Sequence, residues 1–261
     1  MGRVIAFSEF YDYYDEVAQT TGFFNGALID TNILISLSYE IKNDHEDTAD
    51  FFDSIAACKT RYFATVNTKA EFIEFHRRLI LTENLLDAVD QHSQWRISTR
   101  ARAAIHSNWA VVRARQATQG SDPIFGDLQL KTIKKTFSAH KHSGNTGWLT
   151  LCSDFIGGKI SDVERLLAAR GVEYLSQHDS LCQSLFMRKV DWPDAAAMIE
   201  HTGLSVSDAM ILNAFQCSRC SFLFSADFDI GYATLSDSAM KDVIMPDTIA
   251  REYRHFHFKP S

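Results

Sequence analysis

Four acidic side chains stand at positions where an α/β protein can assemble a site. Asp30 ends the apolar run 26–29, and Asp227 follows the strand-like run 221–224 after two intervening residues. Glu71 and Asp208 fall in the first turns of two predicted helices. Because open parallel sheets bind ligands beyond the carboxyl ends of their strands, the four carboxylates can converge there although they are far apart in sequence.

The chemistry of such a cluster follows from its charge. Converging carboxylates repel one another, so their ionised forms need a cation among them. Ligand sets made only of oxygen atoms favour hard ions such as Mg²⁺ or Mn²⁺. An ion of this kind can activate a water molecule and neutralise charge on a phosphodiester in the transition state. The residue types therefore indicate metal-assisted hydrolysis.

Each acid also has a purely local explanation. Thr68-x-x-Glu71 and Ser205-x-x-Asp208 fit capping boxes, or acids that favour the positive end of a helix. Asp30 could cap the helix that follows it, and Asp227 could lie in an ordinary turn. The complete set favours the chemical interpretation, because an apolar strand ending in Asp occurs twice and is joined by two acidic helix starts.

The elements that must position these acids alternate between strands and helices. Short apolar runs predict strands at 26–29, 61–65, 172–175, 221–224 and 243–245. Helices are expected at 8–18, at 45–58, from a cap at Asn67 or Thr68, at 193–203 and from Ser205. Ser161-x-x-Glu164 predicts a helix start, and Gly171 predicts the stop of that helix. This alternation predicts an α/β fold with a mainly parallel sheet covered on both faces.

The stretch from about 81 to 158 lacks clear strands and is predicted to be a helical insertion. Its net charge differs from that of the rest of the chain, which carries −7 in total. Residues 91–142 include only two acidic residues and nine basic ones: Arg96, Arg100, Arg102, Arg113, Arg115, Lys131, Lys134, Lys135 and Lys141. These cations, without Lys141, are the predicted contacts to RNA phosphates, and a solvated helix face is the alternative. Trp109 shares an apolar face with Ile105 and Val112, which favours core packing for it.

Several motifs, taken in order, resemble PIN-domain nucleases, the family that includes the toxins of VapBC-type toxin–antitoxin pairs. The segment 28–35, LIDTNILI, is similar to the opening motif of that family, and 65–72, TVNTKAEF, to the segment that carries its second acid. The segment 203–212, GLSVSDAMIL, is the nearest match, and it resembles the helix of the third acid. The segment 224–229, FSADFD, resembles the motif of the fourth acid, and 243–247, VIMPD, the closing strand. The resemblance covers residues 26–80 and 160–250.

The resemblance implies an α/β/α sandwich with a five-stranded, mainly parallel sheet, and hydrolysis of RNA by a metal-activated water. Asp30, Glu71, Asp208 and Asp227 would hold Mg²⁺ or Mn²⁺, with Asp229 as an auxiliary acid. Asn32 and Ser225 would position the site through hydrogen bonds. Family analogy also implies a homodimer and a protein inhibitor or antitoxin as partners. The expected organisation is an N-terminal helical extension at 1–25, a PIN-like core at 26–80 and 159–261, and the basic insertion at 81–158.

Two other functions are compatible with an α/β fold. A non-catalytic RNA- or protein-binding module could keep the fold, although all four expected acids are present. A dehalogenase-like phosphatase would need a second Asp two residues after Asp30, where this chain has Asn32. A ribonuclease that acts on single-stranded or structured RNA is therefore the preferred hypothesis.

The cysteine content and the hydropathy of the sequence indicate the cellular compartment of the protein. Five scattered cysteines predict reduced thiols, and the Cys217-x-x-Cys220 pair lacks a second pair at zinc spacing. No apolar run reaches the length of a membrane span, and the first residues lack the apolar core of a signal peptide. These features predict a cytoplasmic protein with no membrane partner.

Overall fold

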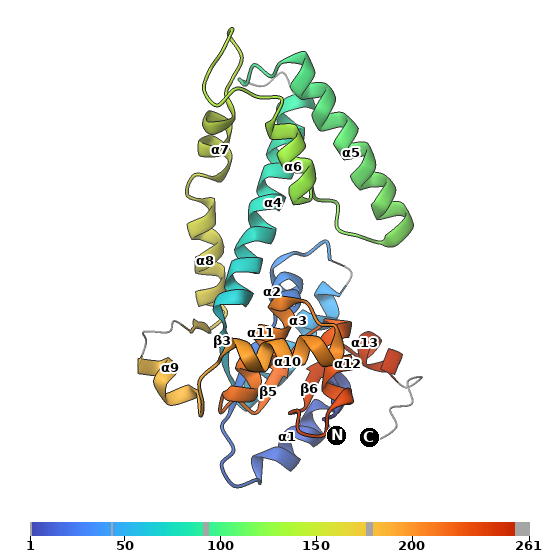
Figure 1. Ribbon diagram of the computed structural model, residues 1–261, viewed down its shortest axis with the longest axis vertical. Helices are drawn as coiled ribbons and strands as arrows, with labels where there is room; N and C mark the ends of the chain where they lie inside the picture. The colour runs from blue at the N-terminus through green and yellow to red at the C-terminus, as the bar shows by residue number, and fades with distance from the viewer. Residues whose placement is uncertain (1, 43, 91–93, 176–179, 254–261) are drawn as a thin grey trace. The chain divides into compact units, whose positions relative to one another are not determined.

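The computed structural model describes residues 2–42, 44–90, 94–175 and 180–253. They form two compact units, which are described separately (Figure 1). Unit 1 comprises residues 1–72 and 166–261, and unit 2 comprises residues 73–165.

Unit 1 is built on a single sheet in which all strand pairings are parallel. Its order is β1-β6-β5-β2-β3-β4, with β2 and β5 at the centre. The strands are β1 (Val4–Ala6), β2 (Gly26–Ile29), β3 (Arg61–Ala64), β4 (Val172–Tyr174), β5 (Phe222–Phe224) and β6 (Val243–Met245). The prediction of an α/β fold with a parallel sheet is confirmed, but the predicted count of five strands is wrong, because the sheet has six.

The additional strand, β1, lies in the segment that was expected to be a helical extension. Val4 pairs with Val243 and Ala6 with Met245, so β1 extends the sheet beyond β6. The Arg3 side chain supports this edge through Asp242, with Nε 2.9 Å from Oδ2. The helix predicted at 8–18 follows as the 3₁₀ turn η1 (Phe7–Glu9) and α1 (Phe10–Ala18).

Helices pack on both faces of the sheet, and the alternation along β5 shows how. Phe222 and Phe224 point to one face, where both rings contact Phe10 of α1 and where Phe224 also contacts Phe51 of α3. Leu223 points to the other face and joins a core cluster with residues of α10, α11 and α12. A strand buried on both faces reads as a continuous apolar run, which explains the sequence signal of β5.

The remaining helices of unit 1 lie between the strands, except for the last one, which follows β6. They are α2 (Thr31–Ser38), α3 (His45–Ser54), the 3₁₀ turn η2 (Ile55–Cys58), α9 (Ser180–Leu185), α10 (Trp192–Thr202), α11 (Val206–Cys217), α12 (Phe228–Ser236) and α13 (Asp247–Glu252). The predicted helix at 193–203 is confirmed by α10, which has Pro193 in its first turn and ends at Gly203, whose φ is +75°. Glycine adopts this left-handed conformation without the steric penalty that other residues incur.

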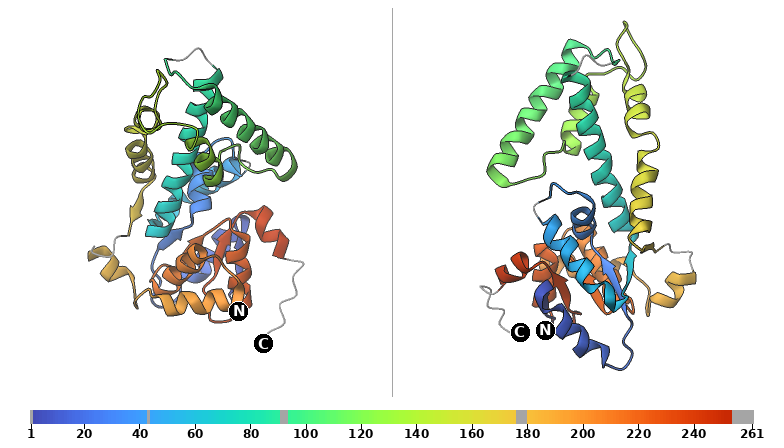
Figure 2. Two further views of the ribbon diagram at one scale, coloured as in Figure 1. Left: turned by 45° about the horizontal axis from the view of Figure 1, so that its top comes forward. Right: turned by 180° about the vertical axis from the view of Figure 1, so that it is seen from behind.

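Unit 2 is formed by helices packed around their own apolar core. α4 (Val66–Asp90) begins in unit 1 and continues into unit 2, and α8 (Lys159–Ala169) returns the chain to unit 1. Between them lie α5 (Thr99–Gln119), α6 (Asp127–Lys134) and α7 (Trp148–Ile156), with α6 between α4 and α5 in every view (Figure 2). The helix start predicted at Ser161 is wrong, because α8 already begins at Lys159, whereas the stop at Gly171 is confirmed by its φ of +72°.

The core of unit 2 brings α4, α5, α6 and α7 together. Its buried members include Leu85 of α4, Ile105 of α5, Ile133 of α6 and Leu151 of α7. Trp109 is partly buried and packs edge to face on Phe125, with ring centroids 5.9 Å apart, as its apolar face predicts. None of the helices in the described part of the chain is both long enough and apolar enough to cross a membrane.

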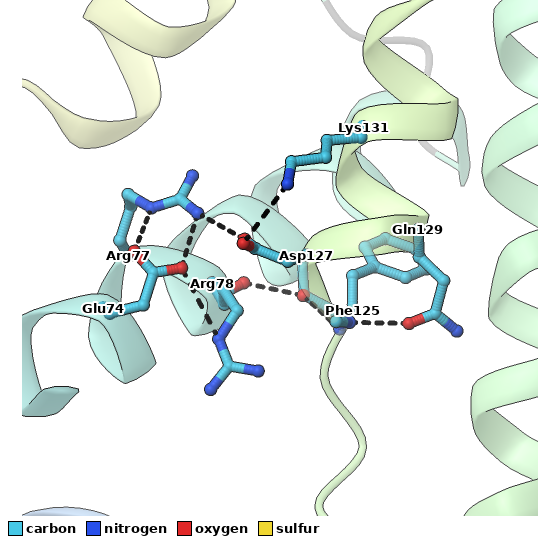
Figure 3. A network of polar contacts seen from close by, with 9 residues as sticks. Glu74, Arg77, Arg78, Phe125, Asp127, Gln129 and Lys131 are labelled. Atoms are coloured by element: carbon cyan, nitrogen blue, oxygen red, sulfur yellow. Dashed lines mark hydrogen bonds and ion pairs between the residues drawn. The ribbon is translucent and has the colours of Figure 1, made fainter. Parts of the chain in front are cut away.

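Polar contacts fasten the start of α6 to α4 within unit 2 (Figure 3). Arg77 of α4 reaches Asp127 of α6, with Nη2 3.1 Å from Oδ1, and also pairs with Glu74 at 2.6 Å. The backbone amide of Phe125 donates to Thr82 Oγ1 at 2.9 Å, which fixes the loop before α6. The ion pairs are partly solvent-exposed and each contributes little, so the buried Phe125 ring provides most of the stabilisation here.

Candidate active site

Asp30 lies at the junction of β2 and α2. All four residues of β2 are buried, and the strand ends because Asp30 becomes the N-cap of α2, with its Oδ1 accepting from the backbone amide of Thr31 at 2.6 Å. The other oxygen, Oδ2, accepts from the hydroxyl of Ser225 at 2.7 Å. The Asp30 residue is only 2% exposed. Both carboxylate oxygens are therefore fixed by hydrogen bonds in a buried position.

Asp227 follows the neighbouring strand, β5, after Ser225 and Ala226. It is the N-cap of α12, and its Oδ1 accepts from the backbone amide of Asp229 at 2.8 Å. Its own amide donates to Ser225 Oγ at 3.0 Å, and Asn32 Nδ2 lies 3.5 Å from its Oδ2. Because β2 and β5 are adjacent and parallel, the two caps meet at one edge of the sheet. Asn32 and Ser225 therefore both lie against the acids that follow the two central strands.

Glu71 reaches the site from α4, and this helix begins at a different residue from the one predicted. The helix begins at Val66, and Thr65 supplies the capping oxygen, which accepts from the amide of Thr68 at 3.2 Å. The predicted cap at Asn67 or Thr68 is therefore wrong, and Glu71 lies in the second turn rather than the first. Its Oε2 accepts from the hydroxyl of Thr31 at 2.7 Å. This bond connects Glu71 to the residue directly after Asp30.

Asp208 lies in the first turn of α11, as predicted. The helix is capped by Ser205, whose hydroxyl accepts from the amide of Asp208 at 3.2 Å. The same hydroxyl donates to Asp208 Oδ2 at 2.6 Å. The Asp208 side chain is thus half-buried and bound to its own cap, so the local and the chemical interpretations of this residue coexist.

The acids are close enough to perturb one another electrostatically. Burial, together with the negative charges of Asp227 and Asp208, raises the pKa of Asp30 to about 7, although the hydrogen bonds from Ser225 and Thr31 oppose the shift. Burial also raises the pKa of Asp208, with contributions from Asp227, Glu71 and Asp229 against the Ser205 hydrogen bond. The structure therefore brings together the four acids selected from the sequence, and Asp229 lies within range of their charge.

The acids are not arranged as a closed metal site. Within the described ranges, no three His, Cys, Asp or Glu side chains are gathered closely enough to hold an ion. Three of the four carboxylates are instead held by hydroxyl groups, those of Ser225, Thr31 and Ser205. The four carboxylates offer oxygen ligands, and burial together with the charges of Asp227 and Asp208 raises the pKa of Asp30. A set of this chemistry suits Mg²⁺ or Mn²⁺ once the partly exposed side chains turn toward a common point.

Thr31 is a supporting residue that sequence inspection did not single out. Its hydroxyl donates to Glu71, and its backbone amide donates to Asp30. The only available signal was its place directly after Asp30. A hydroxyl residue at the first position of a helix is too common to be assigned a role without knowledge of its partner.

The eight basic residues selected from the insertion all belong to unit 2, and all are exposed. Some are engaged within the unit: Arg102 donates to the carbonyl of Val89, Arg113 to Gln116, and Lys131 Nζ lies 3.8 Å from Asp127. The others extend from α5, from α6 or from the segments beside them, namely Arg96, Arg100, Arg115, Lys134 and Lys135. These five are the cations best placed to contact an external anion.

Comparison with family models, with curated proteins and with solved structures found no match to this chain.

Proposed function

We propose that this protein is an endoribonuclease that requires a divalent metal and that unit 1 has a PIN-like fold. The observation that carries the proposal is the convergence of Asp30, Glu71, Asp208 and Asp227 at the carboxyl ends of a parallel sheet. Local capping explains why an acid follows a strand, but it does not explain why four acids share one edge and repel one another. The maintenance of an electrostatically unfavourable cluster is typical of functional sites.

The side chains around the acids have distinct tasks in this proposal. Ser225 orients Asp30, and Asn32 lies beside Asp227, so both acids are positioned before a ligand binds. Thr31 and Ser205 hold Glu71 and Asp208 in partly exposed positions from which they can turn. Mg²⁺ or Mn²⁺, when bound, would lower the pKa of a water molecule and offset the charge on the phosphodiester. The exposed cations of unit 2 would neutralise phosphates elsewhere along the RNA.

The test is cleavage of end-labelled single-stranded RNA with Mn²⁺, with Mg²⁺ or with EDTA. Asp30→Asn is compared with the wild type, and Asp237→Asn is the matched control, since Asp237 lies just after α12, at the end opposite Asp227. We expect metal-dependent cleavage by the wild type and by the control, and loss of at least about a hundredfold in Asp30→Asn. RNA binding without cleavage by any variant, on single-stranded and structured RNA, would instead favour a non-catalytic RNA-binding module.

A further inference from the structure

Unit 1 contains a cavity of about 590 Å³ that is lined by residues of α4, α9 and α11 and of the segments beside them. It lies at the carboxyl ends of β3 and β4, because its lining includes Thr65, which directly follows β3, and Leu175, which directly follows β4. The amide of Leu175 donates to the carbonyl of Ala64 at 3.0 Å, so the two strand ends lie side by side. The volume is in the range of cavities that bind small organic ligands.

The walls of the cavity combine apolar and amide groups. Leu175, Phe186, Val190 and Met210 supply apolar surface, and Asn67 and Gln183 supply amide groups. A planar, polarisable ring with hydrogen-bonding edges fits this combination, since proteins recognise unpaired bases through apolar or aromatic faces and polar edges. An aliphatic ligand would leave the two amides without a partner from the ligand.

Two cations stand at the same cavity and indicate an anionic group on the ligand. Arg188 and Lys189 are both exposed members of the lining. Arg188 pairs with Asp194, which fixes the guanidinium in place and offsets part of its charge. No ion pair to Lys189 is found within the described residues, so its ammonium group is available to a phosphate. A base together with its phosphate is a nucleotide.

Short connections join this cavity to the acids. Thr65, which lines the cavity, also caps α4, and its hydroxyl lies 3.0 Å from that of Thr68. Asn67, which also lines it, precedes Glu71 by four residues in α4, so the two side chains lie on one helix face, about one turn apart. Asn67 and Met210 thus place one part of the cavity near Glu71 and Asp208. Lys189 lies toward the other end of α11, because its carbonyl accepts from Cys217 Sγ at 3.5 Å.

We propose that this cavity binds one nucleotide of the RNA, with the base against Phe186 and Met210 and the phosphate at Lys189. The inference rests on the proposed function, because it takes the ligand to be part of the nuclease substrate. It adds a source of base preference: the amides of Asn67 and Gln183 distinguish bases by the pattern of donors and acceptors at their edges. The RNA would then be cut next to a preferred base.

The test measures binding of nucleoside 5′-monophosphates and of the corresponding nucleosides by calorimetry in EDTA. Met210→Trp places a larger ring at the position proposed for the base and should weaken both kinds of ligand by about tenfold or more. Lys189→Gln should weaken the monophosphates roughly three- to tenfold and leave the nucleosides unchanged. Lys59→Gln is the matched charge control, because Lys59 is exposed and lies between η2 and β3, in a segment that contributes no residue to the lining of the cavity. It should bind every ligand as the wild type does.

The outcomes separate this inference from the proposed function. Asp30→Asn should bind nucleotides like the wild type although it no longer cuts RNA. Nucleotide binding that depends on Met210 and Lys189, in a protein that cuts no RNA, would support the cavity and contradict the nuclease. RNA cleavage without any nucleotide binding, or with equal binding by Met210→Trp and Lys189→Gln, would overturn the cavity assignment alone. Binding of N-acetyl-leucine amide in place of nucleotides would also overturn it, in favour of a protein-docking pocket.

Lys189→Gln keeps the test decisive if Met210→Trp does not fold, because Lys189 is exposed and its replacement removes no buried contact. The second measurement is the base distribution next to the cuts in a randomised RNA. We expect a preference at one position in the wild type and its loss in Met210→Trp. An unchanged preference in a folded Met210→Trp would contradict the assignment.

Discussion

The hydroxyl of Ser225 lies 2.7 Å from Asp30 Oδ2 and donates to it across the two central strands of the sheet. The Ser225 hydroxyl oxygen also accepts a hydrogen bond from the backbone amide of Asp227 at 3.0 Å. One side chain therefore sets the spacing between the acid after β2 and the acid after β5. It also provides part of the hydrogen bonding that a buried carboxylate needs.

Asp30 should make the stability of the metal-free protein depend on pH. Its folded pKa is raised to about 7 by burial and by neighbouring acids, against about 4 in an unfolded chain. Between these values the folded state binds the extra proton, so stability falls as pH rises and is then constant above about pH 7. Relative to Asp30→Asn, the wild type should lose up to about 4 kcal/mol over this window. Urea unfolding in EDTA from pH 4.5 to 8 measures the difference, and equal differences at both ends would contradict this assignment.

Added Mn²⁺ should stabilise the wild type against unfolding. An ion that binds only the folded state at a hundred times its dissociation constant adds about 2.7 kcal/mol. Asp227→Asn removes one charge from the cluster and should lose most of this gain, whereas Asp237→Asn should keep it. Thermal unfolding across a Mn²⁺ titration provides the measurement. An equal rise of the midpoint in all three proteins would indicate binding elsewhere.

Ser205 and Asp208 allow the capping role to be separated from the chemical role. Ser205→Ala removes the acceptor for the Asp208 amide and should reduce stability by about 1 kcal/mol. Asp208→Asn keeps a polar partner for Ser205 and removes a repelled charge, so the metal-free protein should be at least as stable as the wild type. RNA cleavage should be lost in Asp208→Asn. A clear loss of stability with unchanged cleavage would show that Asp208 is only a structural residue.

The exposed lysines of unit 2 should determine the salt dependence of RNA binding. Each phosphate contact to single-stranded RNA contributes about 0.7 to the slope of log affinity against log salt. Replacing Lys134 and Lys135 by Gln should therefore lower the slope by about 1.4. Lys131→Gln is the control on the same helix, because Asp127 already lies 3.8 Å from its ammonium group. Fluorescence anisotropy with catalytically inactive Asp30→Asn protein measures the slopes, and a slope unchanged by the double substitution would remove these lysines from the interface.

The central part of the fold could be predicted because its signals are local. An apolar run that ends in an acid is visible at both Asp30 and Asp227, and the structure places both acids at helix caps after adjacent strands. The position of Asp208 was equally clear from its capping serine. Parallel strands then explain the convergence, since their carboxyl ends share one edge.

Other features depend on contacts that no local pattern reveals. β1 has only three residues, and its partner is β6, near the other end of the described chain. The predicted start of α4 differs from the observed start because Thr65, Asn67 and Thr68 are all suitable caps. In the structure the hydroxyl of Thr65 is the one that accepts from a backbone amide, that of Thr68. The cavity is lined from several separate segments, and the combination of Lys189 with Met210 has no signature in sequence.

The discontinuity of unit 1 has a consequence during protein synthesis. Unit 2 is one continuous segment, so its helices can pack as soon as the ribosome has released them. The centre of the sheet forms later, because β2 cannot pair with β5 until residue 224 has left the ribosome. Asp30 and Glu71 are translated early, whereas Asp208 and Asp227 come after all of unit 2. A growing chain therefore carries a folded basic segment well before it can bring its four acids together.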